Sequence, residues 1–239
     1  MNITIIRLLI GILLLLVPAF ILFRLDHRFL RKSFTVIGRL IITLLVLALL
    51  LYYVFLWDKA WVNILWVLLT GAVATAVYCP KRWQSVPIYV SMTAVTFLIG
   101  ILVLLLVDAD SLFGASMFIP VMTMLQAEAL FVCRRGISIY VLERRMHQEL
   151  DEYLRGNGAT KTEALRPFLT KAITRSFSPV LSQLLLVGLV FVPSLLCGLL
   201  IGGVTPLQGI AFLGVMTAAA LCSTMLVLVL SIYIYTRMS

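Results

Sequence analysis

The sequence predicts an all-α membrane protein with about seven transmembrane helices. Of its 239 residues, 62% are hydrophobic and 12% carry a charge, whereas a soluble domain has roughly 45–50% apolar and about 25% charged residues. The mean hydropathy is +1.12. The apolar residues come in uncharged runs of about 20, the length that a helix needs to cross about 30 Å of hydrocarbon. Because a membrane segment must satisfy its own backbone hydrogen bonds, such runs are helices; the alternating strands of a transmembrane barrel are lacking.

Seven apolar runs follow one another along the chain. The first is too long for the apolar core of a cleavable signal, and basic residues follow it rather than precede it, so we expect a retained span. The chain 1–239 is expected to form a single transmembrane domain, with a cytoplasmic helical extension and elbow at about 134–176. The predicted spans are 3–23, 34–56, 61–78, 86–107, 113–133, 177–200 and 207–235.

The basic residues predict the orientation, because lysine and arginine collect in the cytoplasmic loops of membrane proteins. If the stretch 134–175 is cytoplasmic, alternation of the spans leaves only Arg7 and Lys59 near the outer side. The N-terminus is then outside and the C-terminus is cytoplasmic, and the protein is expected in the inner (plasma) membrane. The other basic residues that fall inside are Arg24, Arg28, Arg31, Lys32, Lys81, Arg82 and Arg237.

The same asymmetry explains the net charge of +9, so no nucleic-acid partner is expected. The four cysteines lack CxxC or Cys/His spacing, and Cys197 and Cys222 lie in apolar runs, where a thiol is a small hydrophobic group. The sequence contains no Walker A phosphate-binding loop, no HExxH and no GxSxG motif. It therefore predicts a protein without its own ATPase or hydrolase site.

The long polar stretch predicts a rigid elbow. The fifth helix is expected to continue into water, because apolar residues recur there at helical spacing. A break with two glycines follows at 155–159. Thr160 and Glu163 then have the spacing of a capping box, so a short helix is expected to begin at Lys161. Pro167 is expected to end its first part within two turns or to kink it. The apolar stripe before the break is Ile139, Leu142, Met146, Leu150 and Tyr153.

One acidic residue, Glu128, lies within a predicted span. An ionisable group in lipid is costly and marks a transport pathway or a polar contact between helices. Glu128 therefore either lines a translocation path with Gln126 and Met124, or reaches the headgroups or a salt bridge close to Arg134. Nearby methionines either offer soft ligands to a metal or pack the bundle, which leaves a metal site unknown. These methionines are Met117, Met122 and Met124.

A set of short motifs runs in order through most of the chain. They are 36–42 (VIGRLII), 118–120 (FIP), 158–164 (GATKTEA) and 187–190 (VGLV), with Pro179, Pro193, Gly198, Gly203 and Pro206. Together they resemble the FetB-type permeases, a family of small ABC-transporter permeases implicated in iron export, with plant relatives linked to aluminium tolerance. The sequence departs from the family pattern at 192–195 and at 127–128, in the spans that would shape a path. The substrate stays open between an iron-like metal ion and another small solute.

The resemblance implies the permease subunit of an ABC transporter, whose ATP and Mg²⁺ are bound by a separate cytoplasmic ATPase subunit. The elbow would be the coupling helix that contacts this ATPase, and a homodimer with two ATPase subunits is implied. No cofactor is expected in this chain. The residues expected to couple the subunits are Thr160, Lys161, Glu163, Ala164 and Arg166.

Two other functions are weighed against this one. A membrane-embedded scaffold or assembly factor would bind a cytoplasmic partner without transporting anything. A secondary transporter would need internal inverted repeats and broken helices with charges at the bilayer midplane. Glu128 alone is too little for that, so the scaffold is the main alternative.

Overall fold

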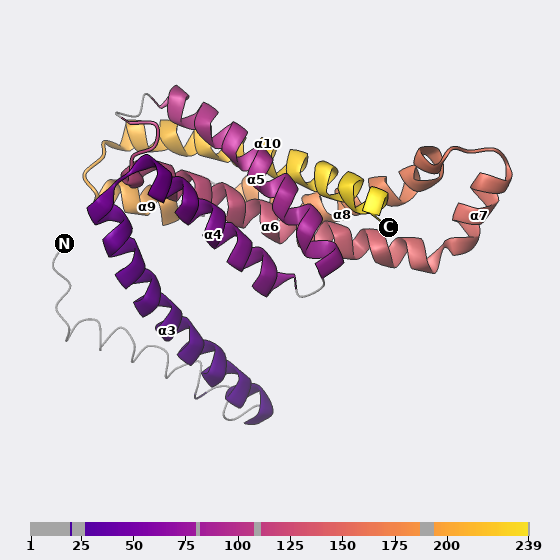
Figure 1. The fold of residues 1–239 in the computed structure, drawn as a ribbon, viewed down its shortest axis with the longest axis horizontal. Coiled ribbons are helices and arrows are strands. Elements are labelled where there is room, and N and C mark those ends of the chain that lie inside the picture. Colours follow the sequence, from indigo (N-terminus) through magenta and orange to yellow (C-terminus); the bar gives the residue numbers. More distant parts are fainter. Residues whose placement is uncertain (1–19, 21–26, 80–81, 108–110, 187–193, 239) are drawn as a thin grey trace. The chain divides into compact units, whose positions relative to one another are not determined.

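The structure, a computed structural model, is helical throughout its regular part (Figure 1). It describes residues 20, 27–79, 82–107, 111–186 and 194–238. Five helices in this part of the chain are long and apolar enough to cross a membrane. They confirm the predicted spans two to five and seven. The predicted first span lies outside the described residues, apart from Phe20.

The chain divides into two compact units, Met1–Trp57 and Asp58–Ser239. The first unit contains α3 (His27–Trp57), whose apolar part, Thr35–Trp57, has a mean hydropathy of 2.7. The second unit contains the remaining described helices, which are α4 (Ala60–Tyr78), α5 (Arg82–Leu106), α6 (Ala115–Met146), α7 (Gln148–Gly156), α8 (Lys161–Leu186), α9 (Ser194–Ile201) and α10 (Pro206–Met238).

Polar contacts join the start of α4 to the start of α6. The Asp58 carboxylate accepts hydrogen bonds from the Ala115 backbone N–H at 2.8 Å and from the Asn63 amide at 3.1 Å. The same amide donates to the Phe113 carbonyl at 2.7 Å. An anion at a helix N-terminus satisfies an N–H that has no partner within the helix. These bonds lower the pKa of Asp58, the Ala115 bond being the larger cause.

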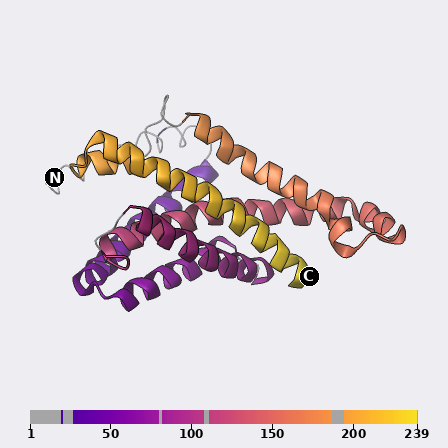
Figure 2. The same cartoon turned by 90° about the horizontal axis from the view of Figure 1, so that it is seen from above.

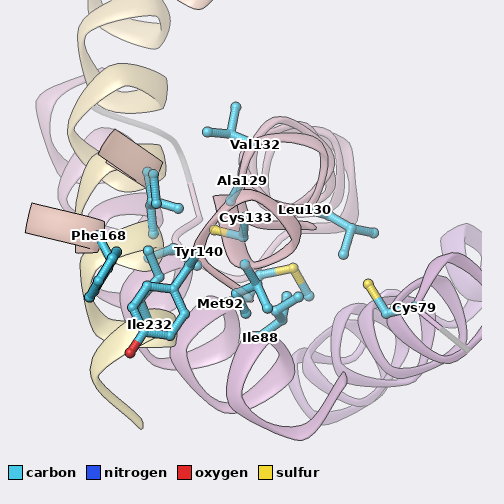
Figure 3. Packing of buried hydrophobic residues seen from close by; sticks show 14 of the residues in the cluster. Cys79, Ile88, Met92, Ala129, Leu130, Val132, Cys133, Tyr140, Phe168 and Ile232 are labelled. Atoms are coloured by element: carbon cyan, nitrogen blue, oxygen red, sulfur yellow. The ribbon is translucent and has the colours of Figure 1, made fainter. Parts of the chain in front are cut away.

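The core of the second unit lies where α5, α6, α8 and α10 meet. Figure 3 shows Met92 and Ile88 from α5 and Ile232 from α10 around the residues of α6. Gly136 lets the helices approach closely, because a Cβ there would collide with the end of the Leu228 side chain and lie 3.3 Å from the Ser176 hydroxyl. The helices therefore pack through small and apolar side chains, as membrane helices do.

At one end of the second unit, α6 and α8 form two arms that α7 closes (Figures 1 and 2). We call the part from Arg134 to Arg175 the α6–α8 hairpin. α6 runs to Met146, which confirms that the fifth helix continues past Arg134. The continuation is shorter than predicted, because His147 separates α6 from α7, and Leu150 and Tyr153 of the predicted apolar stripe therefore lie on α7. The stripe is largely exposed, with Met146 at 69% and Tyr153 at 68%.

The helix that was predicted to be short is 26 residues long, from Lys161 to Leu186, with Pro167 and Pro179 inside it. Of the two predicted effects of Pro167, ending the helix is therefore wrong, whereas a kink stays a prediction. An internal proline removes one hydrogen bond and crowds a carbonyl, but the buried Leu165 and Phe168 on either side hold this turn in the core. Tertiary packing therefore offsets the local cost.

The predicted sixth span, 177–200, is only partly described. Its first part belongs to α8, which ends at Leu186, and its last part to α9, which begins at Ser194. Residues 187–193 lie outside the described residues. The total of seven spans and the orientation of the chain therefore stay predictions.

Candidate functional site

The turn between α7 and α8 has a fixed geometry. Gly158 has a φ of +85°, the left-handed conformation that glycine adopts without strain. The Gly158 N–H donates to the Arg155 carbonyl at 3.0 Å, and the Ala159 N–H donates to the Leu154 carbonyl at 3.0 Å. These two bonds form a Schellman motif, which uses the otherwise unpaired carbonyls at the end of α7.

The predicted capping box is confirmed at the start of α8. The Glu163 carboxylate accepts hydrogen bonds from the Thr160 backbone N–H at 2.8 Å and from the Thr160 hydroxyl at 2.7 Å. The Glu163 N–H donates to the Thr160 hydroxyl oxygen at 3.4 Å. Both bonds from Thr160 hold the pKa of Glu163 below its ordinary value, the side-chain bond being the larger cause. Together with the Gly158 turn, the box sets where α8 begins and in which direction it leaves.

The remaining residues predicted to couple lie on different faces of the first turns of α8. Ala164 is fully buried, together with Leu165 and Phe168, and thus anchors the helix in the core. Arg166 is exposed, as are Thr160 and Glu163. The side chain of Lys161 lies outside the described ones. The elbow therefore has one face fixed to the bundle and one face open to a partner.

A buried carboxylate that the sequence analysis missed ties α8 to α6. Glu143, with a side chain only 8% exposed, accepts a hydrogen bond from Lys171 at 3.1 Å and another from Arg175. His147 lies 3.7 Å away. The spacing of four between Lys171 and Arg175 places both cations on one face of α8, but nothing in the sequence says that this face meets Glu143.

A second carboxylate organises α7 in the same way. Asp151 accepts two hydrogen bonds from Arg155, at 2.9 and 3.2 Å, and lies 3.6 Å from Arg144 of α6. The two acids thus bind cations from three different helices of the hairpin. These contacts link α6, α7 and α8 within the hairpin.

The three residues predicted to line a path are not brought together. The amide of Gln126 is buried and donates to the Val67 carbonyl of α4 at 3.4 Å. Gly71 makes this approach possible, because a Cβ there would lie 3.0 Å from the amide oxygen. Met124 is partly buried, and Glu128 is exposed without an ion pair in the described part of the chain.

An apolar pocket of about 370 Å³ lies beside Gln126, between α4, α5 and α6. Its wall includes Met92 and Ala127, but not Glu128. The structure thus places Gln126 at a pocket and Glu128 on another face of α6. Whether either residue lines a path stays a prediction.

The methionines fall in different surroundings. Met122 is fully buried, whereas Met117 is 37% exposed. Within the described residues, no group of three or more histidine, cysteine, aspartate or glutamate side chains could hold a metal ion.

The sequence analysis also missed a buried hydrogen bond between the Ser91 and Ser231 hydroxyls, which joins α5 to α10. Isolated serines in apolar runs were its only signal in the sequence.

Two comparisons found proteins that are similar to this chain in sequence. The model of the uncharacterised protein family UPF0014 matches residues 5–239. The probable iron export permease protein FetB of Escherichia coli (strain K12) is 26% identical over 211 residues, which cover 84% of this chain and 78% of that protein. No solved structure matches the chain.

Proposed function

The chain belongs to the UPF0014 family, and we propose that it is the permease subunit of an ABC transporter. It is a multi-pass protein of the inner (plasma) membrane, with several apolar helices long enough to cross it. In this proposal it exports a metal ion or another small solute, using ATP that a separate cytoplasmic subunit hydrolyses. The observation that carries the proposal is the capped elbow at the start of α8.

The elbow has the properties that coupling requires. A coupling element must transmit a displacement, so it needs a defined start, a rigid connection to the bundle and an open face. The Gly158 turn and the Thr160–Glu163 box supply the start. Buried Ala164 and the contacts of Glu143 supply the connection, and exposed Arg166 lies on the open face.

The choice of a metal ion as cargo rests on the relatives. The similar protein of Escherichia coli has a name that refers to iron export, and iron is therefore the first ion to test. The site geometry alone does not choose the cargo, because the pocket beside Gln126 is mainly apolar. The proposed transport subunit acts without an enzymatic site of its own, and ATP and Mg²⁺ belong to its partner.

Reconstitution tests the proposal directly. The purified chain is placed in liposomes with a cytoplasmic ATPase that carries a Walker A loop, and ATP hydrolysis and Fe²⁺ movement are measured together. We expect Fe²⁺ to stimulate hydrolysis and to cross the membrane only when ATP is present. A stable complex that moves no ion would favour the scaffold instead.

A charge reversal on the elbow separates coupling from general charge effects. Arg166→Glu changes an exposed side chain without disturbing the core, and we expect it to weaken ATPase association by about tenfold. Arg135→Glu is the matched control, since Arg135 is also exposed and predicted to be cytoplasmic, but lies on α6 rather than on the elbow. Equal effects of the two variants would contradict a role for the elbow.

A further inference from the structure

A polar pocket of about 440 Å³ lies between α6, α7 and the end of α10. It belongs to the second unit and is separate from the exposed face of the elbow. The side chains that matter in it are Tyr140, Arg144, Arg145, Asp151, Arg155 and Tyr235.

The pocket has an excess of positive charge. Three guanidinium groups line it, against the carboxylates of Asp151 and Glu152. Asp151 is already engaged by Arg155 at 2.9 Å and by Arg144 at 3.6 Å. Arg145 has no hydrogen bond or ion pair within the part of the chain that the structure describes, so its five N–H donors are available for a ligand.

Tyr140 provides a second, independent indication of a ligand. Its side chain is fully buried and packs edge to face on Tyr235, with the ring centroids 6.2 Å apart. Its hydroxyl is buried, yet it has no hydrogen-bond partner among the described residues. Figure 3 shows this oxygen directed away from the apolar cluster. A buried hydroxyl without a partner costs free energy, and a ligand that accepts its proton would remove that cost.

The position of the pocket indicates where such a ligand comes from. It lies at the end of α10, where Arg237 stacks over the Tyr233 ring at 4.7 Å. Tyrosine and arginine gather at the headgroup level of membrane helices. On α6, Leu142 and Met146 are 57% and 69% exposed, so the helix that supplies the pocket arginines also has exposed apolar side chains. An amphipathic ligand could therefore place a charged group in the pocket and its apolar part along α6.

We propose that this pocket binds the phosphate oxyanion of an anionic phospholipid headgroup. Arg145 and Arg144 donate charge-assisted hydrogen bonds to the phosphate oxygens, and the Tyr140 hydroxyl donates a third. Basic pockets between membrane helices are suited to anionic headgroups. The bound lipid would hold α7 and the end of α10 against α6, and so stabilise the hairpin.

Lipid binding to the full-length protein in a neutral detergent tests this proposal. Native mass spectrometry measures the affinity for phosphatidylglycerol and for phosphatidylcholine, and a thermal shift with inorganic phosphate alone reports the free anion. We expect phosphatidylglycerol to bind more tightly than phosphatidylcholine. A phosphate-induced shift that Arg145→Gln abolishes would support the oxyanion site and identify free phosphate as a source.

Two variants and one control locate the site. Arg145→Gln is expected to weaken phosphatidylglycerol binding by about tenfold, the effect of losing one charge-assisted contact. Tyr140→Phe is expected to weaken binding while raising the melting temperature of the lipid-free protein, because it removes the unpartnered hydroxyl. Arg135→Gln is the control, since Arg135 is exposed on the same helix but does not line the pocket.

Three results would overturn the proposal. Equal losses in Arg135→Gln and Arg145→Gln would mean diffuse attraction to the surface. Unchanged binding in Tyr140→Phe would mean that its hydroxyl serves only a trapped water. If no phosphate compound bound, but the cytoplasmic ATPase lost affinity for Arg145→Gln, the pocket would be a protein interface.

Discussion

At the scale of single residues, Glu128 is the carboxylate that packing leaves unexplained. It is exposed on α6, in a segment apolar enough to cross a membrane, and has no ion pair within the described chain. A carboxylate facing lipid is costly. Glu128 therefore either reaches the lipid headgroups and water, or faces a polar path or another polypeptide.

For Glu128→Gln we expect transport to fall by about tenfold, as when one charge-assisted contact is lost, with unchanged expression. Ion efflux from proteoliposomes measures the rate. Glu149→Gln is the matched control, because Glu149 is an exposed acid on α7. If Glu128→Gln transported the ion at the normal rate, Glu128 would have no part in the translocation path.

The stability that Glu163 contributes to the protein depends on pH. Its pKa is lowered from the ordinary value of 4.5 by its bonds from Thr160. Its contribution to stability is therefore present above the ordinary pKa and is lost as pH falls through the lower, folded-state value. We expect Glu163→Ala to melt at a lower temperature than the wild type at pH 7, and the gap to close under strong acid.

Circular dichroism of the detergent-solubilised protein at several pH values measures this gap. Glu163→Gln is the control, because glutamine at this position can still accept the hydrogen bonds from Thr160 without a titrating charge. A gap that stayed constant with pH would show that the charge of Glu163 does not contribute.

At the scale of elements, the α7–α8 turn depends on one backbone conformation. Gly158 has a φ of +85°, and a Cβ there would meet nothing within 4 Å, so only the conformation restricts the residue. A left-handed non-glycine residue costs about 1–2 kcal/mol. Gly158→Ala is therefore expected to lower the melting temperature by a few degrees.

Gly156→Ala is the matched control for this turn. A Cβ at Gly156 also meets nothing within 4 Å, but its φ is not positive, and alanine favours the end of α7. Thermal unfolding of both variants should show a loss for Gly158→Ala alone. If Gly158→Ala and Gly156→Ala changed the melting temperature equally, residue 158 would not need the left-handed conformation.

At the scale of the whole molecule, one chain carries one elbow, so the proposed transporter needs two copies. We expect light scattering to give a complex of two permease chains, 26.7 kDa each, with two ATPase subunits. Closed two-fold assemblies are the commonest form of homo-oligomer. A complex with one copy of each subunit would contradict the proposed homodimer.

The sequence by itself determined that this is a helical membrane protein, where its five described spans lie, and where α8 begins. These follow from local physics: the apolar length of a span is set by the bilayer, and the capping box needs only residues three positions apart. The break at Gly158 was predictable for the same reason, because glycine marks a conformation that other residues avoid.

Only the tertiary structure decided which residues meet over long distances. Glu143 forms ion pairs with Lys171 and Arg175 across the hairpin, and the rings of Tyr140 and Tyr235 pack against each other at the polar pocket. Pro167 stays inside α8 because its neighbours are held in the core. Such outcomes depend on which helix faces pack together, and neither spacing nor composition encodes this for residues so far apart in the chain.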